Sequence, residues 1–199
     1  MTTTSDRVVG FGALLRRTPR RAASNAGLNR LRAGVLGAND GIVSVGATVV
    51  GVAGAAASTS TIALAGGAAL LAGALSMASG EYVSVSSQRD AERVAAASGR
   101  PITDAHQDFT NPWQAALASM LAFTAGALIP LLVVLAPWTT AARVPATFAA
   151  VLVALVLTGW ASARFTGASH GRSVLRNVLG GSLAMAVTYG VGALVGVAL

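Results

Sequence analysis

Residues 113–136 read WQAALASMLAFTAGALIPLLVVLA and carry no charged side chain. Roughly 20 mostly apolar residues are enough for an α-helix to cross the hydrocarbon core of a bilayer. Only 11% of the 199 residues are charged and 54% are hydrophobic, a composition far from that of a soluble domain. The composition argues against a cytosolic enzyme, and the stretch predicts a membrane-spanning helix.

Four further stretches have the same apolar character, so the sequence predicts an all-α integral membrane protein with five transmembrane helices. The expected spans are about 33–57, 62–88, 113–136, 144–163 and 177–199. Together they form one transmembrane domain over residues 31–199, with a short loop at 89–112. Residues 1–30 are rich in arginine and are expected to form a basic N-terminal tail.

The arginines are distributed unevenly between the two sides of the expected membrane domain. With five spans, thirteen of the fourteen arginines fall on one side and Arg143 falls on the other. The positive-inside rule then places the N-terminus in the cytoplasm and the C-terminus outside, in a multi-pass protein of the cell (inner) membrane. Lipid headgroups explain the basic tail better than nucleic acid does, because nucleic-acid binding favours a folded basic surface that carries aromatic residues.

Small residues predict close packing of the helices. Gly37 and Gly41 form a GxxxG pair, as do Gly192 and Gly196, although glycine is frequent throughout this chain. Five helices cannot divide into two equal repeats, so a pathway built by symmetry requires two copies of the chain. We therefore expect a homodimer with its seam along Gly37 and Gly41.

Two acidic residues, Asp40 and Glu81, fall inside the expected spans, where a charge costs at least ~2.5 kcal/mol. If Arg32 and Arg89 mark the cytoplasmic ends of the first two helices, each acid lies about 12 Å below the same surface. At equal depth the two carboxylates could bind one cation. Neither span contains a basic residue that would neutralise its acid. The alternative is a protonated carboxyl group that forms a hydrogen bond with a neighbouring helix.

Further polar residues share the helix faces of these two acids, and together they predict a polar lane that leads into the membrane from the cytoplasm. Met77 precedes Glu81 by four residues and so shares its face. The weaker lane candidates are Ser44 and Thr48, which follow Asp40 in four-residue steps, and Ser84 and Gln88, which continue the stripe of Glu81 toward the cytoplasm. A thioether beside carboxylates favours a softer transition metal over Mg²⁺ or Ca²⁺. Core filling is the alternative role of Met77.

The remaining polar candidates are less specific. Asn177 in the last span either lines the lane or bonds across helices. Asp104, His106 and Asp108 alternate in the 89–112 loop, where they form a loose metal contact or a solvated connector. His170 is expected in a solvated loop. The chain contains no cysteine, so we expect no disulfide and no thiolate metal site. It also contains no nucleophile–base pair and no cofactor motif, so we expect neither an enzyme nor a resident cofactor.

Five segments together resemble a known family. LRAGVLGANDGIVS (31–44) and GALSMASGEYVSVSSQRD (73–90) resemble the first two helices of the vacuolar iron transporter family. NPWQAALAS (111–119), LTGWASAR (157–164) and LRNVLGGSLAMAVTYGVG (175–192) resemble the remaining three. The resemblance covers the chain from residue 30 onward, in order.

The resemblance implies proton-coupled export of Fe²⁺ or Mn²⁺ from the cytosol, by a homodimer whose pathway lies at its two-fold interface. It assigns pathway roles to Asp40, Met77 and Glu81. One feature departs from the family pattern, because only residues 89–112 stand where iron-transporting members carry a long Glu-rich insertion that collects metal. The chain therefore resembles a short, prokaryotic-type member. The alternative function is a non-transporting membrane metal sensor or scaffold protein of the same fold.

Overall fold

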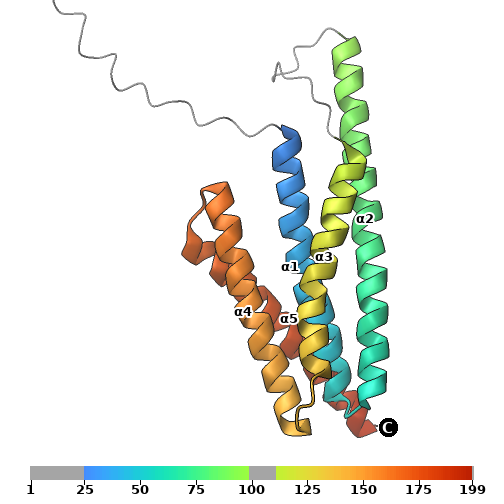
Figure 1. Ribbon diagram of the computed structural model, residues 1–199, viewed down its shortest axis with the longest axis vertical. Coiled ribbons are helices and arrows are strands. Elements are labelled where there is room, and N and C mark those ends of the chain that lie inside the picture. The colour runs from blue at the N-terminus through green and yellow to red at the C-terminus, as the bar shows by residue number, and fades with distance from the viewer. Residues whose placement is uncertain (1–24, 99–110, 199) are drawn as a thin grey trace, which may run out of the picture.

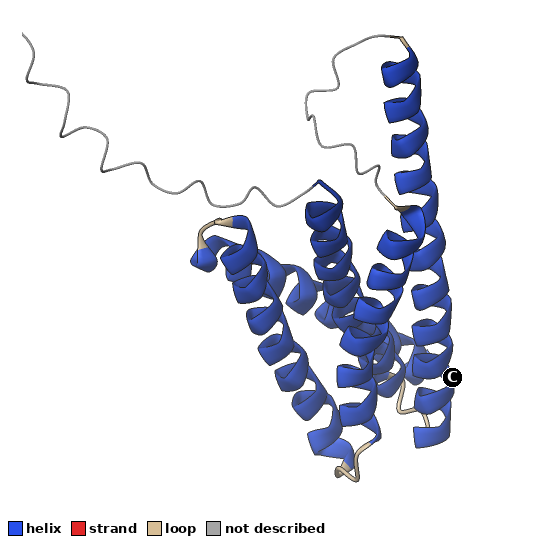
Figure 2. Cartoon of the chain, turned by 45° about the horizontal axis from the view of Figure 1, so that its top comes forward, coloured by secondary structure: helices blue, strands red, loops and turns tan. Residues whose placement is uncertain are grey.

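The computed structural model describes residues 25–98 and 111–198, with side chains from residue 31 onward. Its helices are α1 (Asn25–Gly54), α2 (Thr59–Ala97), α3 (Pro112–Leu135), α4 (Thr140–Thr166) and α5 (His170–Ala198). No strand occurs in these residues (Figure 2). Each of the five helices is long and apolar enough to cross a membrane, which confirms the predicted all-α membrane fold.

Local caps allow short links to end one helix and start the next. Hydroxyl oxygens of Ser58 and Thr139 accept backbone hydrogen bonds in the first turns of α2 and α4. Asn111 caps α3 in the same way, and Pro112 occupies the first turn. Gly167 closes α4 with a φ of 74°, a left-handed conformation that glycine adopts at little cost.

α1 lies at the centre of the bundle and contacts each of the other four helices. Around it, α2 packs on α3, α3 on α4, and α4 on α5. Among the described residues, α2 and α5, the two ends of this series, do not contact each other. Figure 1 shows α4 and α2 on opposite sides of the molecule, with α1 and α3 between them. The ring of helices around α1 is therefore open between α2 and α5.

Glycines determine how closely α1 approaches its neighbours. A Cβ atom at Gly37 or Gly41 would run into the backbone of α3 at Ser119 and Phe123, and one at Gly192 would meet the backbone of α1. Such positions let helix backbones pack closely in lipid. The predicted close packing is confirmed. The predicted dimer seam at Gly37 and Gly41 is wrong, because α3 of the same chain occupies that face.

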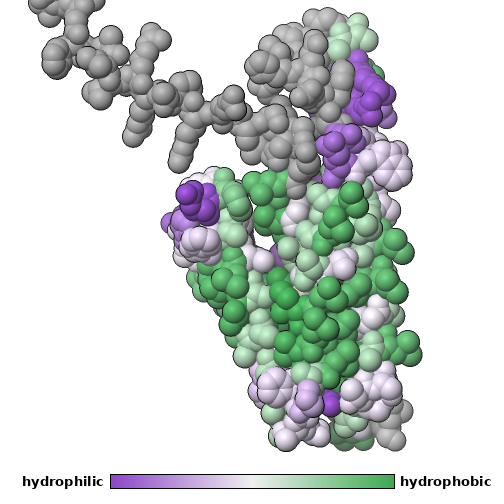
Figure 3. All heavy atoms as spheres, viewed as in Figure 1, coloured by the Kyte–Doolittle hydropathy of each residue, from purple (hydrophilic) through white to green (hydrophobic). Residues whose placement is uncertain are grey.

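The two ends of the bundle differ in charge. At one end, Arg143 Nη2 donates a hydrogen bond to Thr59 Oγ1 over 3.0 Å. The other end, here called the arginine-rich end, carries the other arginines whose side chains the structure describes: Arg32, Arg89, Arg93, Arg164, Arg172 and Arg176. Figure 3 shows an apolar belt between polar ends. The helices alternate in direction as predicted, and the cytoplasmic position of the arginine-rich end stays a prediction.

Four helices extend several residues beyond the predicted spans, and α4 does so at both ends, running from Thr140 to Thr166 rather than over 144–163. α1 begins at Asn25 rather than near residue 33, α2 continues into the predicted 89–112 loop as far as Ala97, and α5 starts at His170, which was expected in a loop. The 39 residues of α2 span about 58 Å, nearly twice the thickness of the hydrocarbon core. Figure 1 shows α2 rising above the other helices. Hydropathy marks the part of a helix inside the bilayer, whereas polar helix-forming residues continue the helix outside it.

Candidate metal pathway

Glu81 on α2 is the most buried acidic side chain among the described residues, with 7% of its surface exposed. Arg32 Nη2, near the start of α1, donates to Glu81 Oε1 over 3.0 Å. The Arg32 side chain is 56% exposed, so the ion pair lies at the surface of the arginine-rich end. The span of Glu81 contains no basic residue, as expected, but the neighbouring helix α1 supplies Arg32 as its partner.

Asp40 and Glu81 lie at different depths in the bundle. A Cβ atom added at Gly41 would meet the backbone of Phe123 of α3, and one added at Gly73 would meet the tip of the Phe123 ring, so Gly73 lies within one side-chain length of the level of Asp40. Glu81 follows Gly73 by eight residues, which is about 12 Å along the helix toward the arginine-rich end. The predicted equal depth is wrong because it took Arg32 and Arg89 to be level with each other, whereas Arg32 contacts Glu81, which lies eight residues before Arg89 on α2. The two acids are therefore two positions along a route and not one site.

Asp40 begins a row of polar side chains along α1. Ser44 Oγ donates to Asp40 Oδ1 over 2.7 Å, and Thr48 Oγ1 donates to the Ser44 carbonyl oxygen over 2.8 Å. The predicted i, i+4 row of polar residues is thus present. Ser44 fixes the orientation of the carboxylate, while no protein donor within the described residues contacts Asp40 Oδ2.

This row lies on the side of α1 between α5 and the α2–α3 pair. Successive residues of an α-helix are about 100° apart, which places Asp40 and Ser44 between Gly41 and Val43 around the helix. Gly41 lies against α3, whereas Val43 lies beside Gly181 of α5. Both Asp40 and Ser44 are half-buried. The polar row therefore faces the opening in the ring of helices.

Met77 lies on α2 midway between the levels of Gly73 and Glu81. Its half-buried side chain packs on the apolar cluster that contains Phe123 and Val45. These are the contacts expected of a core-filling residue. Its spacing of one turn from Glu81 also keeps the thioether on the same side of the helix as the carboxylate. A pathway role for Met77 stays a prediction.

The weaker candidates separate into different parts of the structure. Ser84 and Gln88 are exposed on α2 toward the arginine-rich end, where Gln88 Nε2 donates to an exposed glutamate, Glu92 Oε1, over 3.1 Å. Asn177 borders a cavity between α1, α4 and α5, away from α2. The loop candidates Asp104, His106 and Asp108 lie outside the described residues.

One chain does not supply a complete coordination shell. Within the described residues, no three side chains of the types His, Cys, Asp and Glu come together as a metal site. The acids instead provide single carboxylates at two depths. A divalent transition metal bound at either level requires further oxygen, nitrogen or sulfur ligands from elsewhere.

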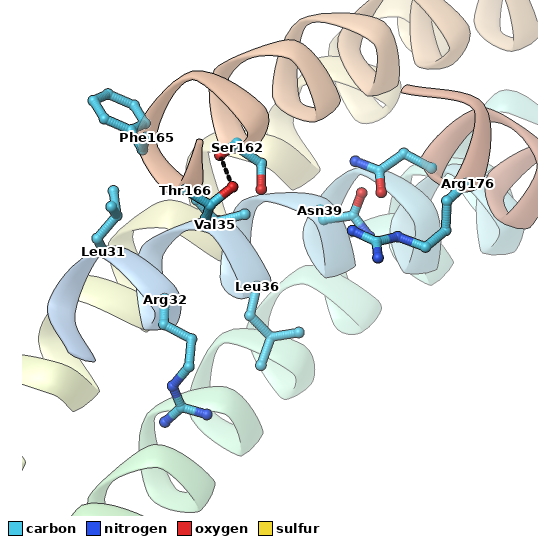
Figure 4. Close-up of a pocket in the computed structure, with 10 residues that line it drawn as sticks. Leu31, Arg32, Val35, Leu36, Asn39, Ser162, Phe165, Thr166 and Arg176 are labelled. Carbon is cyan, nitrogen blue, oxygen red and sulfur yellow. Dashed lines mark hydrogen bonds between the residues drawn. The ribbon is translucent and has the colours of Figure 1, made fainter. Parts of the chain in front are cut away.

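Two residues on α1 were missed by the sequence reasoning. Arg32 forms the ion pair with Glu81, and Asn39 buries its side-chain oxygen without a hydrogen-bond partner among the described residues. Both line the cavity shown in Figure 4. Their spacing of seven residues, which places them on one face of a helix, is the sequence signal that could have linked them.

Comparisons with known proteins match most of the chain to one family. The family model of the VIT family matches residues 31–104 and 94–193. The chain is 44% identical over 185 residues to vacuolar iron transporter homolog 1 of Oryza sativa subsp. japonica, covering 86% of this chain and 79% of that protein. It is also 44% identical over 166 residues to vacuolar iron transporter homolog 2 of Arabidopsis thaliana, covering 83% of this chain and 84% of the relative.

Proposed function

The chain belongs to the VIT family, whose members are transporters, and we propose that it moves a divalent transition metal across the membrane. The proposed cargo is Fe²⁺ or Mn²⁺, exported from the cytosol in exchange for protons. The names of the relatives support iron as one cargo. We place the protein in the cell membrane with its arginine-rich end on the cytoplasmic side. The exported metal then passes Glu81 first and Asp40 second before it leaves on the opposite side.

The opening between α2 and α5 is the proposed route. It exposes the Asp40–Ser44 row to the outside of the protomer. A second copy related by a two-fold axis along the membrane normal would close this opening and bring two Asp40 carboxylates together at one depth. Two Glu81 carboxylates would come together at a shallower depth. The homodimer thereby doubles the ligands that one chain supplies at each level.

Proton coupling follows from the ligand chemistry. A metal ion binds the ionised carboxylate, so metal and protons compete for the same oxygen atoms of Asp40 and Glu81. Metal arriving from the cytosol displaces protons, and protons entering from the other side displace the metal. The metal is the cargo, and the cycle requires no resident cofactor.

The observation that carries the proposal is the Asp40–Ser44 pair, with a separation of 2.7 Å, inside a transmembrane bundle of this family. Charged residues within a spanning helix that face a polar opening are typical of ion pathways. Purified protein in liposomes with an imposed pH gradient tests the function, with Fe²⁺, Mn²⁺, Co²⁺ and Zn²⁺ supplied side by side. Gradient-dependent uptake of Fe²⁺ or Mn²⁺ is expected, and no uptake of any of the four metals would contradict it.

The second candidate is a membrane metal sensor or scaffold that does not transport. Two observations favour it: residues 89–112 are too few for a long metal-collecting insertion, and Arg32 already neutralises Glu81. A sensor of this kind would bind metal in the same liposomes without accumulating it. Metal binding with uptake no faster than in empty liposomes would therefore favour this candidate over the transporter.

A further inference from the structure

A cavity of about 340 Å³ lies at the arginine-rich end, between α1, α4 and α5. Neither α2 nor its acid Glu81 lines it, and Arg32 is the residue that it shares with the proposed metal route. Figure 4 shows that its walls come from Leu31 to Asn39 of α1, from Ser162 to Thr166 of α4, and from Arg176 of α5. The cavity joins three helices that contact one another elsewhere through apolar side chains.

The charged groups of this cavity are all positive. Arg32 and Arg176 line it, and none of its lining residues is acidic. Arg32 forms the ion pair with Glu81, and Figure 4 shows its guanidinium turned toward α2. The Arg176 guanidinium instead extends toward Asn39 and forms no ion pair with any described acid. The cavity therefore repels a metal cation and favours an anion.

Neutral polar groups complete the lining around Arg176. Asn39, Asn177, Ser162 and Thr166 contribute amide and hydroxyl groups from three helices. The Asn39 side-chain oxygen is shielded from solvent and has no hydrogen-bond partner among the described residues. Rotation of this amide would present its NH₂ donors in place of the oxygen, and the Ser162 hydroxyl can also donate, whereas the Thr166 hydroxyl already donates to the Ser162 carbonyl oxygen over 2.9 Å. One guanidinium with several neutral donors suits the oxygens of a phosphate group.

The apolar part of the cavity indicates which phosphate it holds. Leu31, Val35, Leu36 and Phe165 line it beside the polar groups. Leu36 is 49% exposed and Phe165 is 63% exposed, so the apolar wall is continuous with the outer surface of a membrane protein. A free phosphate ion makes no use of such a wall, whereas the acyl chains of a lipid do. Basic pockets between transmembrane helices are known to suit anionic headgroups.

We propose that this cavity binds the phosphate headgroup of an anionic phospholipid, with Arg176 as its main contact. The acyl chains lie along Leu36 and Phe165, and the bound lipid links α1, α4 and α5. The site does not depend on metal transport, so its failure would leave the proposed function unaffected, and the reverse also holds.

The test titrates full-length protein in detergent micelles with phosphatidylglycerol, phosphatidylcholine or inorganic phosphate. The unfolding temperature and the number of lipids retained in native mass spectrometry are measured for each. Phosphatidylglycerol is expected to raise the unfolding temperature of the wild type more than the other two additives do. Arg176→Gln should require a roughly tenfold higher phosphatidylglycerol concentration for the same rise, the loss expected for one charge-assisted hydrogen bond.

Arg172→Gln is the matched control, because Arg172 is an exposed arginine on the same helix that does not line the cavity. It should respond to phosphatidylglycerol as the wild type does. Ser162→Leu fills the cavity from α4 without changing any charge, and it should weaken the response as Arg176→Gln does. Equal responses in the wild type and both cavity variants would overturn the proposal, as would an equal loss in Arg172→Gln. Equal stabilisation by inorganic phosphate or by phosphatidylcholine would overturn the assignment to an anionic lipid.

Discussion

At the scale of single residues, Asp40 and its hydroxyl neighbour carry most of the proposed chemistry. The Ser44 hydroxyl holds one carboxylate oxygen of Asp40 at 2.7 Å, while no described protein donor contacts the other. An acid that was merely structural would be expected to satisfy its remaining oxygen within the protein. We therefore interpret Asp40 as a metal ligand whose carboxylate is held by Ser44 and faces the opening between α2 and α5.

We predict that Asp40→Asn reduces metal uptake into liposomes to the level of empty liposomes, because the amide keeps the shape of the side chain but cannot ionise. Ser44→Ala should reduce uptake about tenfold, through loss of one hydrogen bond to a charged group. Asp90→Asn removes an exposed acid on α2 and serves as the control, with wild-type uptake expected. Wild-type uptake by Asp40→Asn would show that this carboxylate is not in the pathway.

We predict that Arg32→Gln makes Glu81 more available to metal. Removal of a cation in contact with the carboxylate should lower the metal concentration for half-maximal uptake about fivefold. It should also destabilise the protein by about 1 kcal/mol, since Glu81 is buried but Arg32 is more than half exposed. Arg93→Gln, on the exposed part of α2, should change neither quantity. An unchanged or higher half-maximal concentration in Arg32→Gln would show that this ion pair does not compete with the metal.

These residues show which side-chain contacts can be predicted from the sequence and which cannot. The Asp40–Ser44 contact was predictable because it depends only on the four-residue repeat of one helix. The Arg32–Glu81 pair joins residues 49 positions apart, so it depends on how α1 and α2 pack and on how the two helices are aligned lengthwise. The equal depth predicted for the two acids failed for the same reason.

At the scale of helices, the seam between α1 and α3 organises the bundle. Gly37 and Gly41 let the two backbones touch, and Phe123 of α3 fills the space beside Gly73 of α2. The sequence identified these glycines as packing positions but not their partner, because a GxxxG pair suits a helix of the same chain as well as one of a second copy. The spans were predictable from hydropathy, whereas the polar extension of α2 to Ala97 was not.

We predict that Gly41→Ala destabilises the protein by about 1–3 kcal/mol, because the added methyl group collides with the α3 backbone at Phe123. Gly180→Ala is the matched control, since no atom lies near its added Cβ. That control should be neutral or slightly stabilising, because alanine favours the helix. Unfolding in a denaturing detergent measures both. Equal stability of the two variants would contradict the assigned α1–α3 seam.

At the scale of the whole molecule, the open side of the bundle defines the proposed dimer. α1 is covered by α3, α4 and α5 on its other sides, so only the face between α2 and α5 offers Asp40 to a second copy. The chain contains no cysteine, which makes single introduced cysteines unambiguous probes.

We predict that a cysteine at Ser44 cross-links two copies in membranes, because Ser44 lies toward the opening. A cysteine at Gly37 should not cross-link, since that position is filled by α3. A cysteine at Val153, which is exposed on α4, serves as the control for random collision. Cross-linking at Val153 that equals or exceeds that at Ser44 would contradict a dimer through this face.

The central claim is that metal and protons cross through one pathway in opposite directions. Simultaneous recording of Fe²⁺ uptake and internal pH in liposomes containing the wild-type protein tests it most directly. We predict that Fe²⁺ entry is accompanied by proton exit in a fixed ratio, and that Asp40→Asn abolishes both movements together. Fe²⁺ entry without any change in internal pH, or either movement persisting in Asp40→Asn, would contradict the claim.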